Sequence, residues 1–155
     1  MTMADFTIER EILIDAPVDV VWRTVTEPDQ IVRWFADRAV LELHPAGQGR
    51  LVFVDRSSGD ERAFELVVEA VDRPTRFSYR WGQAEGEVPI ASNSVLVEFT
   101  LAAAGDDRTR LCVRETGLAE TSWPDEQKGR YAEDHRNGWA HHLGRIEQLL
   151  STPAA

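Results

Sequence analysis

The side chains best suited to chemistry gather in the stretch HRNGWAHHLGRIEQLL, which runs from His135 to Leu150. It holds three histidines, His135, His141 and His142. A histidine changes charge near neutral pH, so it can act as an acid or base, bind a metal or orient a ligand. The spacing of the three rings distinguishes among these kinds of chemistry.

The spacing argues against a metal site. His135 and His142 are seven residues apart, about 10.5 Å along a helix axis, whereas helical zinc pairs use a spacing of four residues. His141 and His142 are adjacent and diverge by about 100° around the helix. Cys112 is the only cysteine, so neither a cysteine-based zinc site nor an intrachain disulfide can form. Nothing suggests a nucleotide, haem or flavin, so we expect no metal and no cofactor.

Acid-base chemistry is the second possibility. An enzyme could use His135, Tyr131, Asp134 or Glu115, provided that the group reaches the substrate. Glu115 shares a strand face with apolar residues, although it can equally be a strand-end charge near water, and we expect Asp134 on the solvated face of the helix. The chain has no nucleophile elbow, Ser-His-Asp arrangement or paired carboxylate motif. Enzyme activity is therefore a secondary hypothesis, and no residue is assigned as catalytic.

The helix that carries the histidines has one apolar arc, formed by Trp139, Leu143, Ile146 and Leu150. His135 and His142 lie at the edge of this arc, and His141 falls outside it. Gly138 costs about 1 kcal/mol relative to alanine in a helix. We expect that it lets the helix lie close to a sheet or leaves room for a ligand; the alternative is a merely tolerated glycine.

The rest of the chain predicts an α+β protein. Short alternating apolar runs separated by turn residues predict seven antiparallel strands, at residues 7–15, 39–43, 50–54, 63–71, 76–81, 94–101 and 109–116. Two short helices, 16–28 and 28–36, follow the first strand. The alternation gives the sheet one apolar face, and the C-terminal helix is the long element available to cover it.

Bulk composition limits the classes of function. A length of 155 residues favours a single domain over 1–155. The formal net charge of -10 argues against binding nucleic acid. No apolar run approaches the roughly 20 residues that span a bilayer. We therefore expect a cytoplasmic protein without a membrane span.

Three segments, in this order, resemble one known family: IDAPVDVVWRTVTEPDQIVRWF, TRLCVRETGL and HRNGWAHHLGRIEQLL. They resemble the activator of heat-shock-protein ATPase homologue-like (AHSA) family of the START-like (SRPBCC) superfamily. The most specific positions are Ala16, Pro17, Val21, Trp22, Trp34, Phe35, Gly138, Trp139 and Leu143. The resemblance implies a helix-grip fold, in which a curved antiparallel sheet wraps around a long C-terminal helix and leaves a cavity between them.

The resemblance implies several functions. Superfamily members bind lipids, hormones or polyketides, a minority are cyclases or hydrolases, and the eukaryotic proteins that name the family stimulate a chaperone ATPase. Only one domain is expected here, without the additional N-terminal domain of those activators, so chaperone contact is the less favoured role. A homodimer is also possible.

We favour binding of a small hydrophobic or aromatic molecule, lipid-like or polyketide-like, in the cavity. The residues expected to line it are Trp34, Phe35, Phe53, Phe64, Tyr79, Trp81, Phe99, Tyr131, His135, Gly138, Trp139 and His142. The alternative for each aromatic residue is that it simply fills the core. The loop GQAEGEVPIASN after Trp81 is long enough to form a lid over the pocket mouth.

Overall fold

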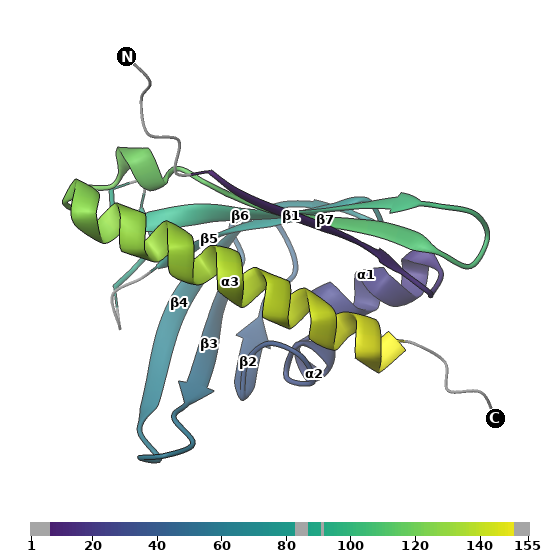
Figure 1. Ribbon diagram of the computed structural model, residues 1–155, viewed down its shortest axis with the longest axis horizontal. Helices are drawn as coiled ribbons and strands as arrows, with labels where there is room; N and C mark the ends of the chain where they lie inside the picture. Colours follow the sequence, from purple (N-terminus) through teal and green to yellow (C-terminus); the bar gives the residue numbers. More distant parts are fainter. Residues whose placement is uncertain (1–6, 83–86, 91, 151–155) are drawn as a thin grey trace.

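The computed structural model describes residues 7–82, 87–90 and 92–150, and within these ranges seven antiparallel strands form one curved sheet (Figure 1). The strands are β1 (Ile8–Ile14), β2 (Arg38–Leu41), β3 (Gln48–Val54), β4 (Glu61–Asp72), β5 (Arg76–Gly82), β6 (Ser94–Ala103) and β7 (Thr109–Thr116). The helices are α1 (Val18–Thr26), α2 (Pro28–Ile31), the 3-10 helix η1 (Leu118–Glu120) and α3 (Asp125–Leu150). The predicted α+β, helix-grip architecture is confirmed.

The strands lie in the order β1-β7-β6-β5-β4-β3-β2, so all neighbours except β1 and β7 are also consecutive in the chain. The pairing register shifts between Val68 and Ala70 of β4, which indicates a bulge. Bulges bend a strand and increase its twist. The part of the sheet formed by β2, β3 and β4 turns away from the part formed by β1, β6 and β7 (Figure 1). The bend gives the sheet its concave side.

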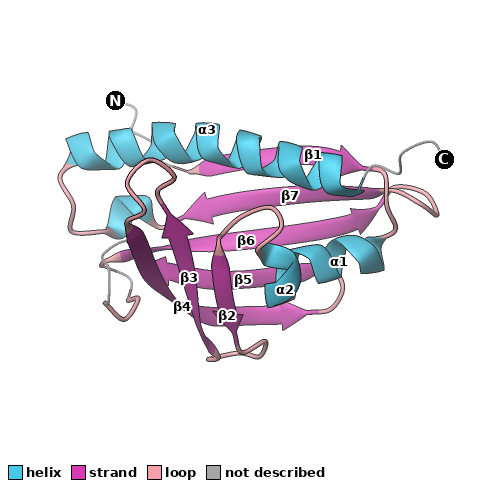
Figure 2. Ribbon diagram, turned by 90° about the horizontal axis from the view of Figure 1, so that it is seen from below, coloured by secondary structure: helices cyan, strands magenta, loops and turns pink. Residues whose placement is uncertain are grey.

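Helix α3 lies along the β1 side of this concavity (Figure 2). It is 26 residues long and begins with Asp125 and Glu126, whose negative charges suit the positive end of a helix. Its buried side includes Trp139, Leu143 and Ile146, as its apolar arc predicts. No helix in the described part of the chain combines the length and the apolar composition needed to cross a membrane.

Helices α1 and α2 lie beside the C-terminal half of α3 (Figures 1 and 2). The second helix is shorter than predicted, because it ends at Ile31 instead of continuing to residue 36. Turns follow it, and the backbone N–H groups of Trp34 and Phe35 both donate to the carbonyl of Ile31. Both aromatic side chains are buried. The tightened turn thus directs two consecutive rings into the interior. In a regular helix these two rings would point about 100° apart.

The interior beside α1 and α2 is densely filled with aromatic side chains. Trp22, Trp34, Phe77 and Phe99 are among the largest fully buried residues. The indole Nε1 of Trp34 donates to the carbonyl of Thr24 at 2.8 Å, so its polar atom is satisfied within the core. This cluster forms the floor against which the C-terminal half of α3 packs.

Candidate functional site

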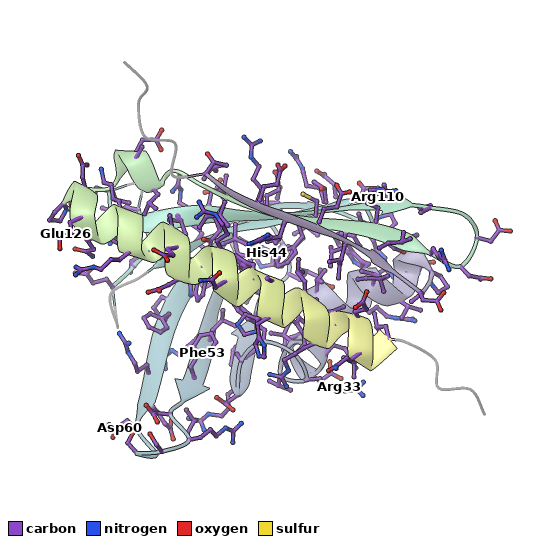
Figure 3. All side chains as sticks on the ribbon, in the orientation of Figure 1. Arg33, His44, Phe53, Asp60, Arg110 and Glu126 are labelled. Carbon is purple, nitrogen blue, oxygen red and sulfur yellow. The ribbon has the colours of Figure 1, made fainter. Side chains whose placement is uncertain are left out.

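One face of α3 borders a pocket of about 260 Å³. This face presents Asp134, His135, Gly138, Trp139 and His142, spaced so that they share one side of a helix. The opposite wall is formed by Phe35 after α2, Phe53 on β3 and Trp81 on β5. Phe53 lies on the part of the sheet that extends away from α3 (Figure 3). The volume is slightly below the roughly 300 Å³ at which typical ligand pockets begin.

Aromatic rings in mutual contact form the apolar wall. Phe35 stacks on Trp139 with ring centroids 5.2 Å apart and an interplanar angle of 23°. Phe35 also meets Phe53 and Trp81 edge-on, at 5.5 and 5.6 Å between centroids. Offset stacks and edge contacts are the favoured arrangements of aromatic pairs. The wall is therefore a packed unit rather than a set of separate side chains.

Gly138 lies on the helix side of this pocket. A Cβ atom built at this position would meet no heavy atom within 4 Å, other than the neighbouring residues and the backbone of its own helix. The expectation that the glycine allows close approach of helix and sheet is therefore wrong. The expectation that it leaves open space beside the helix agrees with the geometry.

A polar cluster lies at the His135 end of the pocket. Glu115 of β7 is only 2% exposed, and its Oε1 accepts hydrogen bonds from Nδ1 of His135 at 3.1 Å and from the hydroxyl of Tyr131 at 3.4 Å. Its Oε2 is buried and has no hydrogen-bond partner among the described residues. The reading of Glu115 as a strand-end charge near water is therefore wrong. Its neighbours on α3 supply the polar contacts that a buried carboxylate requires.

The buried Tyr79 and the partly buried Tyr131, both near Glu115, are held in their neutral form. Burial raises the pKa of Tyr131 well above its usual range, and the negative charge of Glu115 raises it further. Burial and the same carboxylate also raise the pKa of Tyr79. Both hydroxyls thus remain protonated across the physiological pH range, and that of Tyr131 acts as a hydrogen-bond donor to Glu115.

His142 occupies the other end of the pocket. Its Nδ1 lies 3.3 Å from the carbonyl oxygen of Trp34, and its ring meets Phe35 edge-on at 4.9 Å between centroids. Burial lowers its pKa to about 4, although the hydrogen bond to Trp34 acts in the opposite direction. The ring is therefore neutral at physiological pH.

The structure brings together part of the predicted set. The predicted residues that line the pocket are Phe35, Phe53, Trp81, His135, Gly138, Trp139 and His142. Trp34, Tyr79 and Phe99 instead surround a void of about 10 Å³ in the core, which is at most the size of one water molecule. They are core residues, because all three are buried and the void is also lined by Val25 of α1 and Ile31 of α2.

Two further predicted residues lie just outside the pocket. Phe64 contacts the rings of Phe53 and Trp81 from behind, at 6.1 and 6.3 Å between centroids. Tyr131 stacks on His135 at 3.7 Å and bonds Glu115. Both support wall residues rather than line the space.

Asp134 is a pocket residue that the sequence reasoning assigned to the solvated face. It is exposed as expected, yet it also borders the pocket. The available signal was its spacing of four and eight residues from Gly138 and His142, which places all three on one helix face.

The predicted lid lies partly outside the described residues, which omit 83–86 and 91. Of the described part, Val88 and Pro89 border a different hollow, together with Arg50, Glu65 and Val67. None of residues 87–90 lines the pocket beside α3. Within the described ranges, no three His, Cys, Asp or Glu side chains are grouped so that they could hold a metal ion.

A curved antiparallel sheet around a long C-terminal helix, with two short helices after β1, defines a protein of the helix-grip class. The chain belongs to the family described as activator of Hsp90 ATPase homolog 1-like protein, whose model matches residues 15–151. The predicted family is thereby confirmed. No curated protein matches the chain.

Solved structures share the fold over nearly the whole chain. Protein MLL2253 from Mesorhizobium loti is 23% identical, with a TM-score of 0.74 and coverage of 96% of this chain and 99% of that one. DynU16, which is encoded in the dynemicin biosynthetic locus, is 25% identical, with a TM-score of 0.72 and coverage of 96% and 48%. The Aha1 dimer from Colwellia psychrerythraea is 14% identical, with a TM-score of 0.69 and coverage of 99% and 100%.

Proposed function

We propose that this protein binds a small, largely aromatic molecule in the pocket between α3 and the bend of the sheet. The observation that carries the proposal is open space of about 260 Å³ bounded by aromatic rings, a glycine and a few polar side chains. Ligand pockets commonly have apolar walls with a small number of polar groups that fix orientation. Similarity to DynU16, a protein of the dynemicin biosynthetic locus, supports a role with a small organic molecule.

Filling the pocket tests the proposal. Leucine at position 138 projects into the open space, whereas leucine at position 144 lies on the same helix but outside the pocket. A Cβ atom at either glycine meets no heavy atom within 4 Å beyond its own helix and chain neighbours, so the two substitutions are well matched. Naphthalene, anthracene and biphenyl derivatives should quench the fluorescence of Trp81 and Trp139 in the wild type and in Gly144→Leu, but not in Gly138→Leu. Equal quenching in both variants contradicts the proposal.

Acid-base catalysis in the same pocket, as in a cyclase or hydrolase, is a second candidate. It is favoured by the contact of His135 with the buried carboxylate of Glu115, because a carboxylate can hold an imidazole in one tautomer and one orientation. The test is turnover of any ligand found by quenching. Loss of turnover with retained binding in His135→Asn supports this candidate, and unchanged turnover removes it.

Contact with a chaperone rests on the family description alone. It is tested by adding the purified protein to an Hsp90 ATPase assay. Stimulation that persists in Gly138→Leu would assign this activity to a surface other than the pocket. The homodimer remains a prediction, and light scattering of the purified protein measures it directly.

A further inference from the structure

Two histidine rings lie at opposite ends of the pocket. His135 precedes Gly138 by three residues and His142 follows it by four, so all three lie on one face of α3. The two histidines are two helical turns apart, or about 10.5 Å along the axis. The open space beside Gly138 separates them.

Both rings use Nδ1 as a donor to the protein. Nδ1 of His135 faces the carboxylate of Glu115 at 3.1 Å, and Nδ1 of His142 faces the carbonyl of Trp34 at 3.3 Å. A carboxylate and a carbonyl both accept hydrogen bonds, so each Nδ1 carries the proton. In the neutral ring the other nitrogen, Nε2, is then an acceptor. The hydrogen bonds from these two rings to Glu115 and Trp34 both use Nδ1.

The remaining polar groups of the pocket lining also offer hydrogen-bond acceptors rather than donors. Asp134 is exposed at the pocket border and offers carboxylate oxygens, which also accept. The indole nitrogens of Trp81 and Trp139 are buried, so these donors are not exposed to the open space of the pocket. The side chains that line the pocket therefore present acceptors to its interior.

We propose, building on the proposed binding function, that the ligand is a flat aromatic molecule with hydrogen-bond donors, such as phenolic hydroxyls, at two opposite ends. The two donors bond Nε2 of His135 and Nε2 of His142, while the ring system lies against Phe35 and Trp139. A carbonyl or a carboxylate at either end of the ligand would face the lone pair of a histidine Nε2 and could not form a hydrogen bond with it. The net charge of -10 on the protein disfavours anionic ligands further.

A matched set of probes separates shape from hydrogen bonding. Para,para′-dihydroxybiphenyl has two donors, para-hydroxybiphenyl has one, and para,para′-dimethoxybiphenyl has none. Binding is measured by tryptophan quenching at about pH 8, where free histidine is neutral and phenols keep their proton. At roughly fivefold per hydrogen bond, the diol should bind about 10- to 30-fold more tightly than the dimethoxy compound, with the mono-phenol between them.

Asparagine substitutions test each histidine while keeping the hydrogen bond that its Nδ1 donates to the protein. The side-chain amide of asparagine can donate from the position of Nδ1, but it has no atom at the position of Nε2. His135→Asn and His142→Asn should each weaken the diol about fivefold and leave the dimethoxy compound unchanged. His141→Asn is the control, because His141 lies outside the pocket and should affect neither probe.

The outcomes separate this inference from the proposed function. Equal affinity for the diol and the dimethoxy compound, or equal weakening of both by His135→Asn and His142→Asn, overturns the inference and leaves the binding function intact. Failure of all three probes to bind counts against the proposed function itself.

Discussion

Nδ1 of His135 lies 3.1 Å from Oε1 of Glu115, and this contact joins the wall of the pocket to a carboxylate that is only 2% exposed. The same oxygen is reached by the hydroxyl of Tyr131 at 3.4 Å, a long hydrogen bond. A buried charge is tolerated when it is paired and hydrogen-bonded. His135 therefore contributes to the stability of the fold as well as to the pocket.

Truncation of His135 should be costly for this reason. We expect His135→Ala to lower the free energy of unfolding by about 3 kcal/mol, because it leaves Glu115 buried without its nearer partner. Urea denaturation measures the change. The double variant His135→Ala/Glu115→Leu should recover most of the loss, and His141→Ala should cost little. Equal losses in His135→Ala and His141→Ala would show that the contact with Glu115 is not important for stability.

Gly138→Ala should stabilise the protein. No heavy atom outside its own helix and chain neighbours lies within 4 Å of the added methyl group, so the gain in helix propensity, about 0.5 to 1 kcal/mol, is not opposed by a clash. Gly144→Ala should raise the free energy of unfolding by a similar amount, and urea denaturation measures both variants. Ligand affinity should fall only in Gly138→Ala, because this methyl group alone enters the pocket. A destabilised Gly138→Ala variant would mean that the glycine is needed for packing.

His142 should make stability depend on pH in the acid range. Burial lowers its pKa from 6.5 to about 4 in the folded state, and the nearby His141 and Arg145 act in the same direction. Between these values the unfolded chain binds more protons, so the free energy of unfolding falls as the pH decreases from 6.5 to about 4. Above pH 6.5 the full contribution of His142 to the free energy of unfolding is present. Since the ring partly contacts solvent, we expect a loss on the order of 1 to 2 kcal/mol.

The variant His142→Asn isolates this effect. It keeps a donor for the carbonyl of Trp34 and has no titrating group. Urea denaturation of both proteins across the acid range should show a smaller decrease for the variant. Parallel curves for wild type and variant would show that His142 does not cause the pH dependence.

Substitutions at Phe99 and Phe53 should distinguish a residue needed for the core from a residue needed for ligand binding. Phe99 is 1% exposed in the core, whereas Phe53 is only partly buried and lines the pocket. We expect Phe99→Ala to lower the free energy of unfolding by about 3 to 5 kcal/mol. Phe53→Ala should cost less and weaken ligand binding more. The less disruptive Phe99→Leu should fold well and keep full affinity; reduced affinity in that variant would indicate that the ligand reaches the core.

The arrangement of the fold could be predicted from the alternation of apolar residues, because period two distinguishes the inner from the outer face of each strand. The same rule could not locate the pocket. Tyr79 and Trp81 lie on one face of β5, yet Trp81 lines the pocket and Tyr79 lies in the core. Their surroundings depend on where α3, the turn after α2 and the bend of the sheet meet, and these are relations between elements distant in the chain.

The polar part of the site was only partly predictable. The helical spacing of His135 and His142 placed them on the inner edge of α3, and the structure agrees. The partner of His135 is Glu115, twenty residues earlier and on another element. The position of Glu115 among apolar strand residues made it unusual, but the sequence does not show which helix residue Glu115 contacts. That pairing follows from the position of α3 along β1 and β7.

Gly138 is the one described residue of the pocket lining that carries no side chain. An alanine methyl group at residue 138 meets no heavy atom within 4 Å beyond its own helix and chain neighbours, and valine and leucine would extend further into the open space. Selectivity for ligand size could therefore be engineered, or could diverge among relatives, through exchange of one amino acid.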